Sequence, residues 1–456
     1  MPHPPAQHLL PRPGRQRAGA LHRPRPDRRS DALLGTALPQ RPEHGRRDTL
    51  PRRIPPQPPQ LPGHRRGEGQ NHGTGHLVTP PPSGTDSGSA ADAQTHLPQA
   101  GPQPEPLDLA DIRRKVEDIL QSFLDERLRD LPHHQARPLV EHLRTLIAAG
   151  GKRTRPVLCA IGWHAAGRSG TPPQLLHLAA AIEMFHAAAM IHDDIIDRSA
   201  TRRGHPSAHQ ALRAHCTTPA DSDTRSWFGA SAALVLGDLA LSWSDQLLYR
   251  GRLDTAQLRA VHPLLDTLRS EALIGCYIEL LATGHLDDDV ETPMEINRLK
   301  SAKYTIERPL HLGAVLGGAD TAVLDTCTAY GIPLGEAFQL RDDILGVFGD
   351  TSVTGKPALD DLREGKPTLL LAIALSRADP GQRELLRRLV GDPGLDEEGA
   401  AQVREILTTT GARQEVEYRI EAGRREAVAA LTKRNLPAPV IAVLHRMIHA
   451  VTRHNA

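Results

Sequence analysis

The chain has 456 residues, which is enough for one large domain or two of ordinary size. Its formal net charge of +1 gives no reason to expect nucleic acid or an anionic membrane as a partner. No run of about 18 apolar residues and no apolar N-terminal segment are seen, so we expect neither a transmembrane helix nor a secretory signal. The four cysteines lie far apart without a CxxC pair, which argues against a zinc site or a disulfide framework. We therefore expect buried, unreactive thiols and a cytoplasmic location.

Residues 1–105 differ in composition from the rest of the chain. They are rich in Pro, Gly, Arg, His and Gln and contain no Lys, the first of which is Lys115. Such a segment cannot bury enough apolar surface to offset the entropy cost of ordering, so a disordered N-terminal tail is predicted. Three interpretations remain open: a stretch upstream of the true start codon, a solvated tail without a specific role, or a tail that docks on a partner or into a protein shell.

From residue 106 onward the pattern is helical. Leu109, Ile112, Val116 and Ile119 recur at spacings of three and four, which marks one apolar helix face. Similar patterns cover roughly residues 174–198, 231–249, 255–282, 292–317, 321–348, 367–377, 382–390, 398–430 and 437–453. Gly- and Pro-containing turns separate these segments, and no alternating run is long enough for a convincing strand. We expect one all-α domain over residues 106–456.

The strongest chemical signal is the sequence His-Asp-Asp-Ile-Ile-Asp at residues 192–197, which ends an apolar helical segment. On a helix, this spacing places Asp193 and Asp197 on one face with Asp194 beside them. Three carboxylates this close repel one another and need a counterion, and oxygen-only ligands favour a hard cation such as Mg²⁺. The alternative is a solvated acidic helix end. It is disfavoured because acids at a helix C-terminus oppose the macrodipole and residues 187–191 are apolar.

A second acidic pair, Asp342 and Asp343, closes another apolar helical segment within Phe-Gln-Leu-Arg-Asp-Asp-Ile-Leu-Gly at residues 338–346. Two helices that each end in paired aspartates can face each other across a cavity and hold several magnesium ions around one diphosphate. Metal bound in this way would stabilise diphosphate as a leaving group.

Basic residues accompany both acidic motifs. Residues 150–156 read Gly-Gly-Lys-Arg-Thr-Arg-Pro, a glycine turn in which Lys152 and Arg155 can point at one anion. Further cations at or near breaks are Arg202, Arg203, Lys300, Lys303, Lys356 and Lys366. Any one of these is equally well explained as a solvated cation. Together they predict a site for two polyanions, one held through metal and the other held directly by Arg and Lys.

These motifs, taken in order, resemble those of the trans-isoprenyl diphosphate synthase (polyprenyl synthetase) family. The ordered set is Gly-Gly-Lys-Arg-x-Arg-Pro, His-Asp-Asp-x-x-Asp, Arg-Arg-Gly-x-Pro, Lys-Ser-x-x-Tyr-Thr, Phe-Gln-x-x-Asp-Asp, Gly-Lys-Pro and Glu-Gly-Lys-x-Thr. The resemblance covers the chain from about Ala110 to the C-terminus and says nothing about residues 1–105. It implies an antiparallel helical bundle around a deep central cavity, the isoprenoid synthase fold, and a homodimer.

The resemblance also implies roles for individual residues. An allylic diphosphate would bind through Mg²⁺ to both acidic motifs, and isopentenyl diphosphate would bind without metal. On the allylic side the matching positions are Asp193, Asp194, Asp197, Asp342, Asp343, Arg202, Lys300, Ser301, Gln339, Lys356 and Lys366. On the isopentenyl side they are Gly151, Lys152, Arg155, His186 and Arg203. The allylic substrate ionises to a carbocation, the double bond of isopentenyl diphosphate attacks it, and the departing diphosphate removes a proton.

One position departs from the family pattern. Gly346 stands where the second motif usually has a third aspartate, and Asp350 lies one turn further on. We interpret this as a subfamily variation that leaves activity intact.

Chain length is predicted from the residues before Asp193, which form the floor of the tail cavity in this family. Ala188 and Ala189 would not block that cavity, whereas Phe185 lies on the same face and deeper.

The predicted product is therefore geranylgeranyl diphosphate, with a longer chain, farnesylgeranyl or above, as the alternative. The two rival functions are a terpene cyclase and a non-catalytic partner subunit. A terpene cyclase would lack the second Asp-Asp pair and the isopentenyl site built on Lys152, Arg155 and Arg203. A non-catalytic partner subunit of a synthase is supported only by Gly346, and the intact first motif speaks against it.

Overall fold

The computed structural model describes residues 107–217, 221–349, 359–432 and 436–452. All of them belong to one compact unit. The predicted tail, residues 1–105, lies outside the described residues, as do Asp350 and Lys356. Within the described part, the only strands are two-residue segments that pair as an antiparallel hairpin, so the all-α prediction is confirmed.

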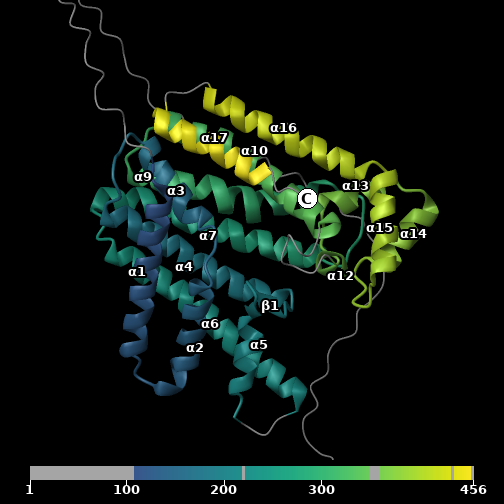
Figure 1. Cartoon of the computed structure of the whole chain (residues 1–456), viewed down its shortest axis with the longest axis horizontal. Coiled ribbons are helices and arrows are strands. Elements are labelled where there is room, and N and C mark those ends of the chain that lie inside the picture. Colours follow the sequence, from purple (N-terminus) through teal and green to yellow (C-terminus); the bar gives the residue numbers. More distant parts are fainter. Residues whose placement is uncertain (1–106, 218–220, 350–358, 433–435, 453–456) are drawn as a thin grey trace, which may run out of the picture. The chain divides into compact units, whose positions relative to one another are not determined.

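Figure 1 shows how the helices are arranged. The main helices are α1 (Leu109–Arg129), α2 (Arg137–Ala148), α3 (Thr154–Ala165), α4 (Pro173–Ile196), α6 (Ser222–Arg250), α7 (Thr255–Ala282), α8 (Glu291–Asn297), α9 (Arg308–Leu316), α10 (Thr321–Phe348), α12 (Asp360–Glu364), α13 (Leu369–Arg377), α14 (Pro380–Leu389), α15 (Glu397–Thr409), α16 (Ala412–Thr432) and α17 (Ala438–Thr452). Shorter elements are the 3₁₀ turns His134–Ala136 and Arg213–His215, helix α5 (Ala208–Leu212), and strands β1 (Thr201–Arg202) and β2 (His205–Pro206).

Helix α1 follows the period read from the sequence. Its N-cap, Asp108, accepts hydrogen bonds from the backbone amides of Ala110 and Asp111, which satisfies two of the free donors at the helix start. The residues spaced by three and four, Ile112 and Val116 among them, are buried. They pack against α4, α3 and α2.

Helix α4 is at the centre of the first half of the bundle, where it packs against α6, α3 and α1. By length and composition alone it could cross a membrane, and it is the only such helix among the described residues. However, 67% of its most apolar window is buried inside the bundle, as expected for a core helix. Small residues such as Ala180 and Ala187 let its neighbours approach on several sides.

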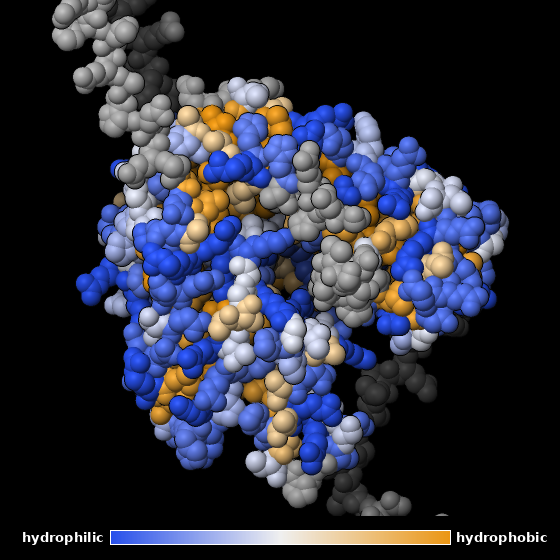
Figure 2. Space-filling view, viewed as in Figure 1, coloured by the Kyte–Doolittle hydropathy of each residue, from blue (hydrophilic) through white to orange (hydrophobic). Residues whose placement is uncertain are grey.

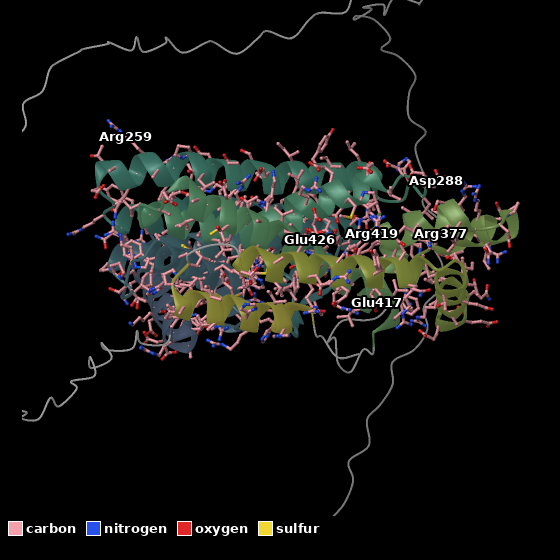
Figure 3. All side chains as sticks on the ribbon, turned by 90° about the horizontal axis from the view of Figure 1, so that it is seen from above. Arg259, Asp288, Arg377, Glu417, Arg419 and Glu426 are labelled. Atoms are coloured by element: carbon pink, nitrogen blue, oxygen red, sulfur yellow. The ribbon has the colours of Figure 1, made fainter. Side chains whose placement is uncertain are left out.

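Helix α10 is at the centre of the second half. It packs against α16, and α17 lies beside both (Figure 1). Arg341 of α10 forms a bidentate pair with Glu417 of α16, at Nη1–Oε1 2.9 Å and Nη2–Oε2 2.8 Å. Figure 3 shows Glu417 on α16, and it shows Arg259 and Asp288 at the periphery, where both are exposed.

Three local features differ from the sequence prediction. Helix α6 begins at Ser222, about nine residues earlier than predicted, with Asp221 as its N-cap. The predicted helix 398–430 is two helices, α15 and α16, because Gly411 has a left-handed φ of 72° between them. Residues Arg298–Glu307 form a π-helix, η3, which continues α8 into α9. Such segments are rare and frequently occur at functional sites.

Candidate active site

A cavity of about 730 Å³ opens between α4, α7, η3, α10 and α12. On the face seen in Figure 2 the surface is hollowed near its centre, and hydrophilic residues predominate at the rim. The predicted residues that line the cavity are Lys152, Arg155, Phe185, His186, Ala189, Asp193, Lys300, Ser301, Gln339, Asp342, Asp343 and Lys366. Both acidic motifs and the cationic turn therefore share one hollow, although they are far apart in sequence.

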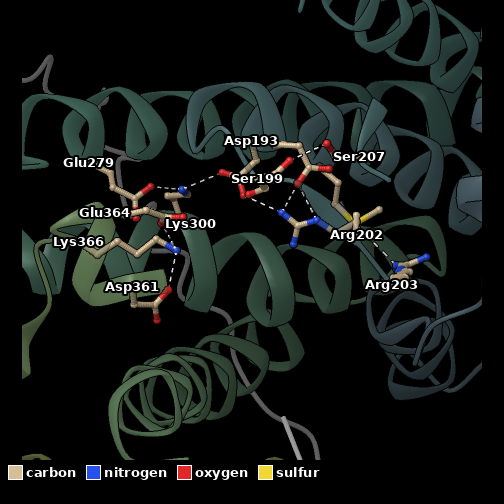
Figure 4. Close-up of polar contacts among 12 residues, drawn as sticks. Asp193, Ser199, Arg202, Arg203, Ser207, Glu279, Lys300, Asp361, Glu364 and Lys366 are labelled. Atoms are coloured by element: carbon tan, nitrogen blue, oxygen red, sulfur yellow. Dashed lines mark hydrogen bonds and ion pairs between the residues drawn. The ribbon is translucent and has the colours of Figure 1, made fainter. Parts of the chain in front are cut away.

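Asp193, the first residue of the first motif, lies between two cations (Figure 4). Its Oδ1 accepts from Lys300 Nζ at 3.3 Å, and its Oδ2 is 3.9 Å from Arg202 Nη2. Lys300 also pairs with Glu279 of α7, a residue that the sequence analysis did not single out. Burial opposes the charge of Lys300, but Asp193 and Glu279 more than offset this and raise its pKa above the usual value. Lys300 is thus a fixed cation at the cavity wall.

Asp194 does not face the cavity. It is 1% exposed, and its Oδ1 accepts from Arg202 Nε at 2.8 Å and Nη2 at 2.5 Å. This pair links the end of α4 to the β1–β2 hairpin, and neither side chain is among the described residues that line the cavity. The metal and diphosphate roles expected of Asp194 and Arg202 stay predictions. The helical spacing explains why Asp193 lines the cavity and Asp194 does not, because adjacent residues on a helix point about 100° apart.

Asp197 follows α4 directly and lies near the charged groups of α12 and α7. Burial raises its pKa to about 7, and the negative charge of Asp193 adds to this effect. The opposite charge of Lys366 acts in the other direction. Lys366 contacts Asp361 Oδ1 at 3.1 Å and Glu364 Oε2 at 3.4 Å. Asp197 is half-buried and is not among the described residues that line the cavity, so the metal role expected of it stays a prediction.

The second motif is held by a chain of hydrogen bonds from η3. Ser301 Oγ donates to Gln339 Oε1 at 2.5 Å, and Gln339 Nε2 donates to Asp343 Oδ1 at 2.9 Å. Burial raises the pKa of Asp343 to about 7, against the lowering effect of the Gln339 hydrogen bond. Asp342, its neighbour, lines the cavity.

Gly346 also lines the cavity, and another acid stands beside it. A Cβ at residue 346 would lie 2.1 Å from Asp361 Oδ2, so a side chain there would require the Asp361 carboxylate to move. Asp361 comes from α12 and lines the cavity with Asp342 and Asp343. Asp361 was not predicted from the sequence. Its spacing from the second motif carries no helical signal, although it lies five residues before Lys366.

The cationic side of the cavity is built around Tyr304 of η3. Arg155 has its guanidinium 4.2 Å from the Tyr304 ring centroid, and its Nη2 donates to Thr305 Oγ1 at 2.7 Å. His186 Nδ1 is 3.2 Å from the Tyr304 hydroxyl. Burial, reinforced by the charges of Arg155 and Arg203, holds the pKa of His186 well below its usual value. His186 is therefore a neutral hydrogen-bonding group among cations.

Gly151 and Arg203 lie together at the edge of this side. A Cβ on Gly151 would be 3.0 Å from Arg203 Nη2, and Arg203 Nη1 donates to the carbonyl of Leu146 at 3.2 Å. Burial lowers the pKa of Arg203, and the charge of Arg153 adds to this effect. Within the described residues, neither Gly151 nor Arg203 is among those that line the cavity.

Arg153, which sequence reasoning passed over, is the buried support of this turn. It is 3% exposed, and its Nη1 is 2.7 Å from Glu183 Oε1 of α4, itself 3% exposed. Its Nε reaches Glu117 of α1 at 3.2 Å, and its Nη2 donates to the Ile147 carbonyl at 2.5 Å. Its φ of 47° is in the left-handed region. The sequence did contain a signal for this pair, because Glu183 is an acidic residue on a helix that was predicted to be buried, three residues before His186.

The apolar part of the cavity includes Phe185, Ala189, Ala272, Leu273 and Cys276. Ala188 is 2% exposed and is not among the described residues that line the cavity. Of the two alanines predicted at the cavity floor, Ala189 therefore lies on the wall and Ala188 in the core. The Phe185 ring stands edge-on to Tyr304 at a centroid distance of 5.9 Å.

The expectation of four buried thiols is wrong for two of the cysteines. Cys159 and Cys327 are buried, whereas Cys216 and Cys276 are only partly buried. Cys276 lies on the cavity wall, where burial raises its pKa. A raised pKa favours the protonated form of that thiol, which is the less nucleophilic one. That the four thiols are unreactive stays a prediction.

Comparison with known proteins agrees with this geometry. The family model described as polyprenyl synthetase matches residues 136–408, which is more than half of the chain. This chain belongs to the polyprenyl synthetase family. The family members are prenyltransferases that make trans-prenyl diphosphates, and the family resemblance read from the motifs is confirmed.

Individual relatives support the same conclusion. A geranylfarnesyl diphosphate synthase of Aeropyrum pernix is 33% identical over 277 residues, which cover 60% of this chain and 80% of the relative. A short chain isoprenyl diphosphate synthase of Methanothermobacter thermautotrophicus is 31% identical, with 67% and 86% covered. The crystal structure of a geranylgeranyl pyrophosphate synthase from Corynebacterium glutamicum, complexed with isoprenyl diphosphate and magnesium, is 38% identical with a TM-score of 0.72. It covers 76% of this chain and 100% of that one, and the isoprenoid synthase fold is thereby confirmed.

Proposed function

We propose that the chain is a magnesium-dependent synthase that condenses isopentenyl diphosphate with an allylic diphosphate and yields mainly geranylgeranyl diphosphate. The observation that carries the proposal is the shared cavity. Asp193 and Asp342 line it from two different helices, and Lys152 and Arg155 line it with them. One cavity therefore offers oxygen ligands for hard cations and direct cationic contacts for a second anion.

The residues present fit magnesium. The donors that line the cavity near the acidic motifs are carboxylates, including Asp193, Asp342, Asp343 and Asp361, and hard cations prefer oxygen. Among the described residues, no three His, Cys, Asp or Glu side chains form a group that could hold an ion unaided. We therefore infer that diphosphate oxygens complete the coordination, as is common for Mg²⁺ sites with substrate phosphates. When bound there, the metal neutralises charge that develops on the departing diphosphate.

The chain's own residues supply the rest. Lys300 adds a fixed positive charge beside Asp193, and Lys366 adds another at the α12 side. Arg155 and Lys152 hold the diphosphate of the second substrate, with neutral His186 as a further partner. The apolar wall of Phe185, Ala189 and Ala272 excludes water from the carbocation. No side chain has to act as a nucleophile.

The proposal is tested by incubating the purified chain with Mg²⁺, isopentenyl diphosphate and each of dimethylallyl, geranyl and farnesyl diphosphate, then separating the products by length. We expect linear products with geranylgeranyl diphosphate as the main one. Cyclic hydrocarbons would indicate a cyclase. Absence of turnover, restored only by a second synthase chain, would indicate a non-catalytic subunit.

Product length is expected to depend on Phe185. Its ring lines the cavity one turn before Ala189, so replacing it with alanine opens space below the growing chain. The printed names of the relatives include geranylfarnesyl and geranylgeranyl synthases, so the family itself accommodates several lengths. We expect Phe185→Ala to shift the main product upward by at least one isoprene unit, measured by chromatography of the dephosphorylated alcohols. Tyr418→Ala, which removes an exposed aromatic ring of α16 far from these positions in sequence, is the control. If Phe185→Ala and the parent gave products of identical length, Phe185 would only pack the core and would not set the product length.

A homodimer is also part of the proposal. Helix α7 exposes Leu273, Ile274, Tyr277 and Leu281, which recur at helical spacing and form one apolar stripe. Neighbouring α6 exposes Leu234 and Val235 as well. A second copy of the chain that covers these faces would remove this surface from water.

We expect Ile274→Asp with Leu281→Asp to convert a dimer into a monomer, measured by size-exclusion chromatography with light scattering. A matched double change on α16, Glu421→Lys with Arg424→Asp, reverses an existing ion pair between an exposed and a half-buried residue and should leave the mass unchanged. A parent chain that is monomeric at micromolar concentration would contradict this part of the proposal.

A further inference from the structure

We propose that Asp361 supplies the carboxylate that the second acidic motif lacks at Gly346. This inference rests on the proposed function and deepens it, because it assigns a further acid to the metal-diphosphate side of the cavity. The observation that carries it is spatial. The Oδ2 atom of Asp361 lies 2.1 Å from the point where a side chain at residue 346 would begin. A carboxylate is thus present at that wall, delivered by α12 rather than by α10.

The two oxygens of Asp361 have different surroundings. Oδ1 is 3.1 Å from Lys366 Nζ, which fixes the carboxylate in one orientation (Figure 4). Oδ2 is the oxygen directed at Gly346. The side chain is 26% exposed and lines the cavity together with Asp342. An acid held by a lysine through one oxygen retains acceptor capacity on the other, which is what metal-bound water or a metal ion requires.

The fit between the two positions is mutual. The atoms nearest to a Cβ at residue 346 are all from Asp361: Oδ2, then Cγ at 3.1 Å, then Cβ at 3.6 Å. Glycine at 346 therefore makes room for Asp361. Conversely, truncating Asp361 to alanine removes the two closest atoms and leaves ordinary contact at 3.6 Å. Without the Asp361 carboxylate, a Cβ at residue 346 therefore keeps only an ordinary van der Waals contact with residue 361, which gives a side chain there room to begin.

Moving the carboxylate from residue 361 to residue 346 defines the experiment. Four full-length proteins are compared: the parent, Asp361→Ala, the double variant Gly346→Asp with Asp361→Ala, and Glu397→Gln. The last is a control in which a mostly exposed acid of α15 loses its charge. Binding of Mn²⁺ in the presence of inorganic diphosphate is measured by electron paramagnetic resonance of free Mn²⁺, together with steady-state turnover and circular dichroism.

We expect Asp361→Ala to weaken diphosphate-dependent Mn²⁺ binding by about 10- to 100-fold, as removal of a supporting carboxylate commonly does. The double variant should recover most of this loss, and Glu397→Gln should match the parent. A folded Asp361→Ala protein that binds Mn²⁺ as the parent does would overturn the inference. So would a folded double variant with no recovery, because Asp361 would then act only by holding Lys366. If the parent itself shows neither diphosphate-dependent Mn²⁺ binding nor turnover, the proposed function fails, which is a distinct result.

Discussion

Replacing Asp193 with asparagine is expected to lower kcat by about a thousandfold or more, while the fold is retained. The carboxylate lines the cavity and is 3.3 Å from Lys300, so its loss removes a negative ligand where we place the metal-bound diphosphate. Removal of one preorganised electrostatic group from an active site commonly costs about 10²–10³ in kcat, and loss of a metal ligand adds to this. Turnover with isopentenyl diphosphate and an allylic diphosphate at saturating Mg²⁺ measures the effect.

The matched control is Asp118→Asn. Asp118 is on α1, 65% of its side chain is exposed, and it forms a surface pair with Arg114 at 3.3 Å. Surface pairs of this kind contribute about 0.5 kcal/mol or less, so turnover should be unaffected. An Asp193→Asn enzyme with more than a tenth of the parent's kcat would show that the first motif does not carry the chemistry.

Replacing Arg153 with methionine is expected to lower the free energy of unfolding by about 3–5 kcal/mol. Arg153 and Glu183 are both 3% exposed and form an ion pair at 2.7 Å, so removing the cation leaves a carboxylate buried without its partner. Such an uncompensated charge is far more costly than the pair itself is stabilising. Urea denaturation followed by circular dichroism measures the change.

The same variant should affect the isopentenyl site selectively. Arg153 lies between Lys152 and Arg155 and holds a left-handed backbone conformation, so its pair with Glu183 sets the direction of that turn. We expect KM for isopentenyl diphosphate to rise more than KM for the allylic substrate. Arg153→Lys, which keeps the charge, should recover part of both effects. Equal increases in the two KM values, or a loss of stability below about 1 kcal/mol, would contradict this role for a buried ion pair.

Much of the site was predictable because its parts are local. The acids of residues 192–197, the pair Asp342–Asp343 and the turn at Lys152 each occur within one short motif. Helical periodicity then places those motifs on helices, since a buried helix repeats its apolar residues at three and four. The family resemblance placed Phe185, Ala188 and Ala189 at the tail cavity, and Phe185 and Ala189 line the cavity whereas Ala188 does not. Their role in setting chain length stays a prediction.

The missed residues depend on contacts between distant segments. Glu279 approaches Lys300 and Asp361 approaches Gly346 only because α7 and α12 pack beside η3 and α10. The π-helix could not be predicted from the hydrophobic periodicity of the sequence either. It nevertheless brings Lys300, Ser301, Tyr304 and Thr305 to the cavity. Asp194 fits the motif in sequence, yet its direction on α4 turns it toward Arg202. A sequence pattern does not specify which way a side chain points or which distant segments pack together.

The central claim is that a diphosphate binds through divalent metal between Asp193 and Asp342. Its most direct test is a crystal structure of the chain grown with Mn²⁺, inorganic diphosphate and isopentenyl diphosphate, with anomalous scattering measured at the manganese edge. We predict manganese peaks at coordination distance, about 2.0–2.3 Å, from oxygens of both Asp193 and Asp342, with a diphosphate between them. Isopentenyl diphosphate should lie on Lys152 and Arg155 without metal. Manganese bound to only one of the two motifs, or diphosphate held away from both, would contradict the account.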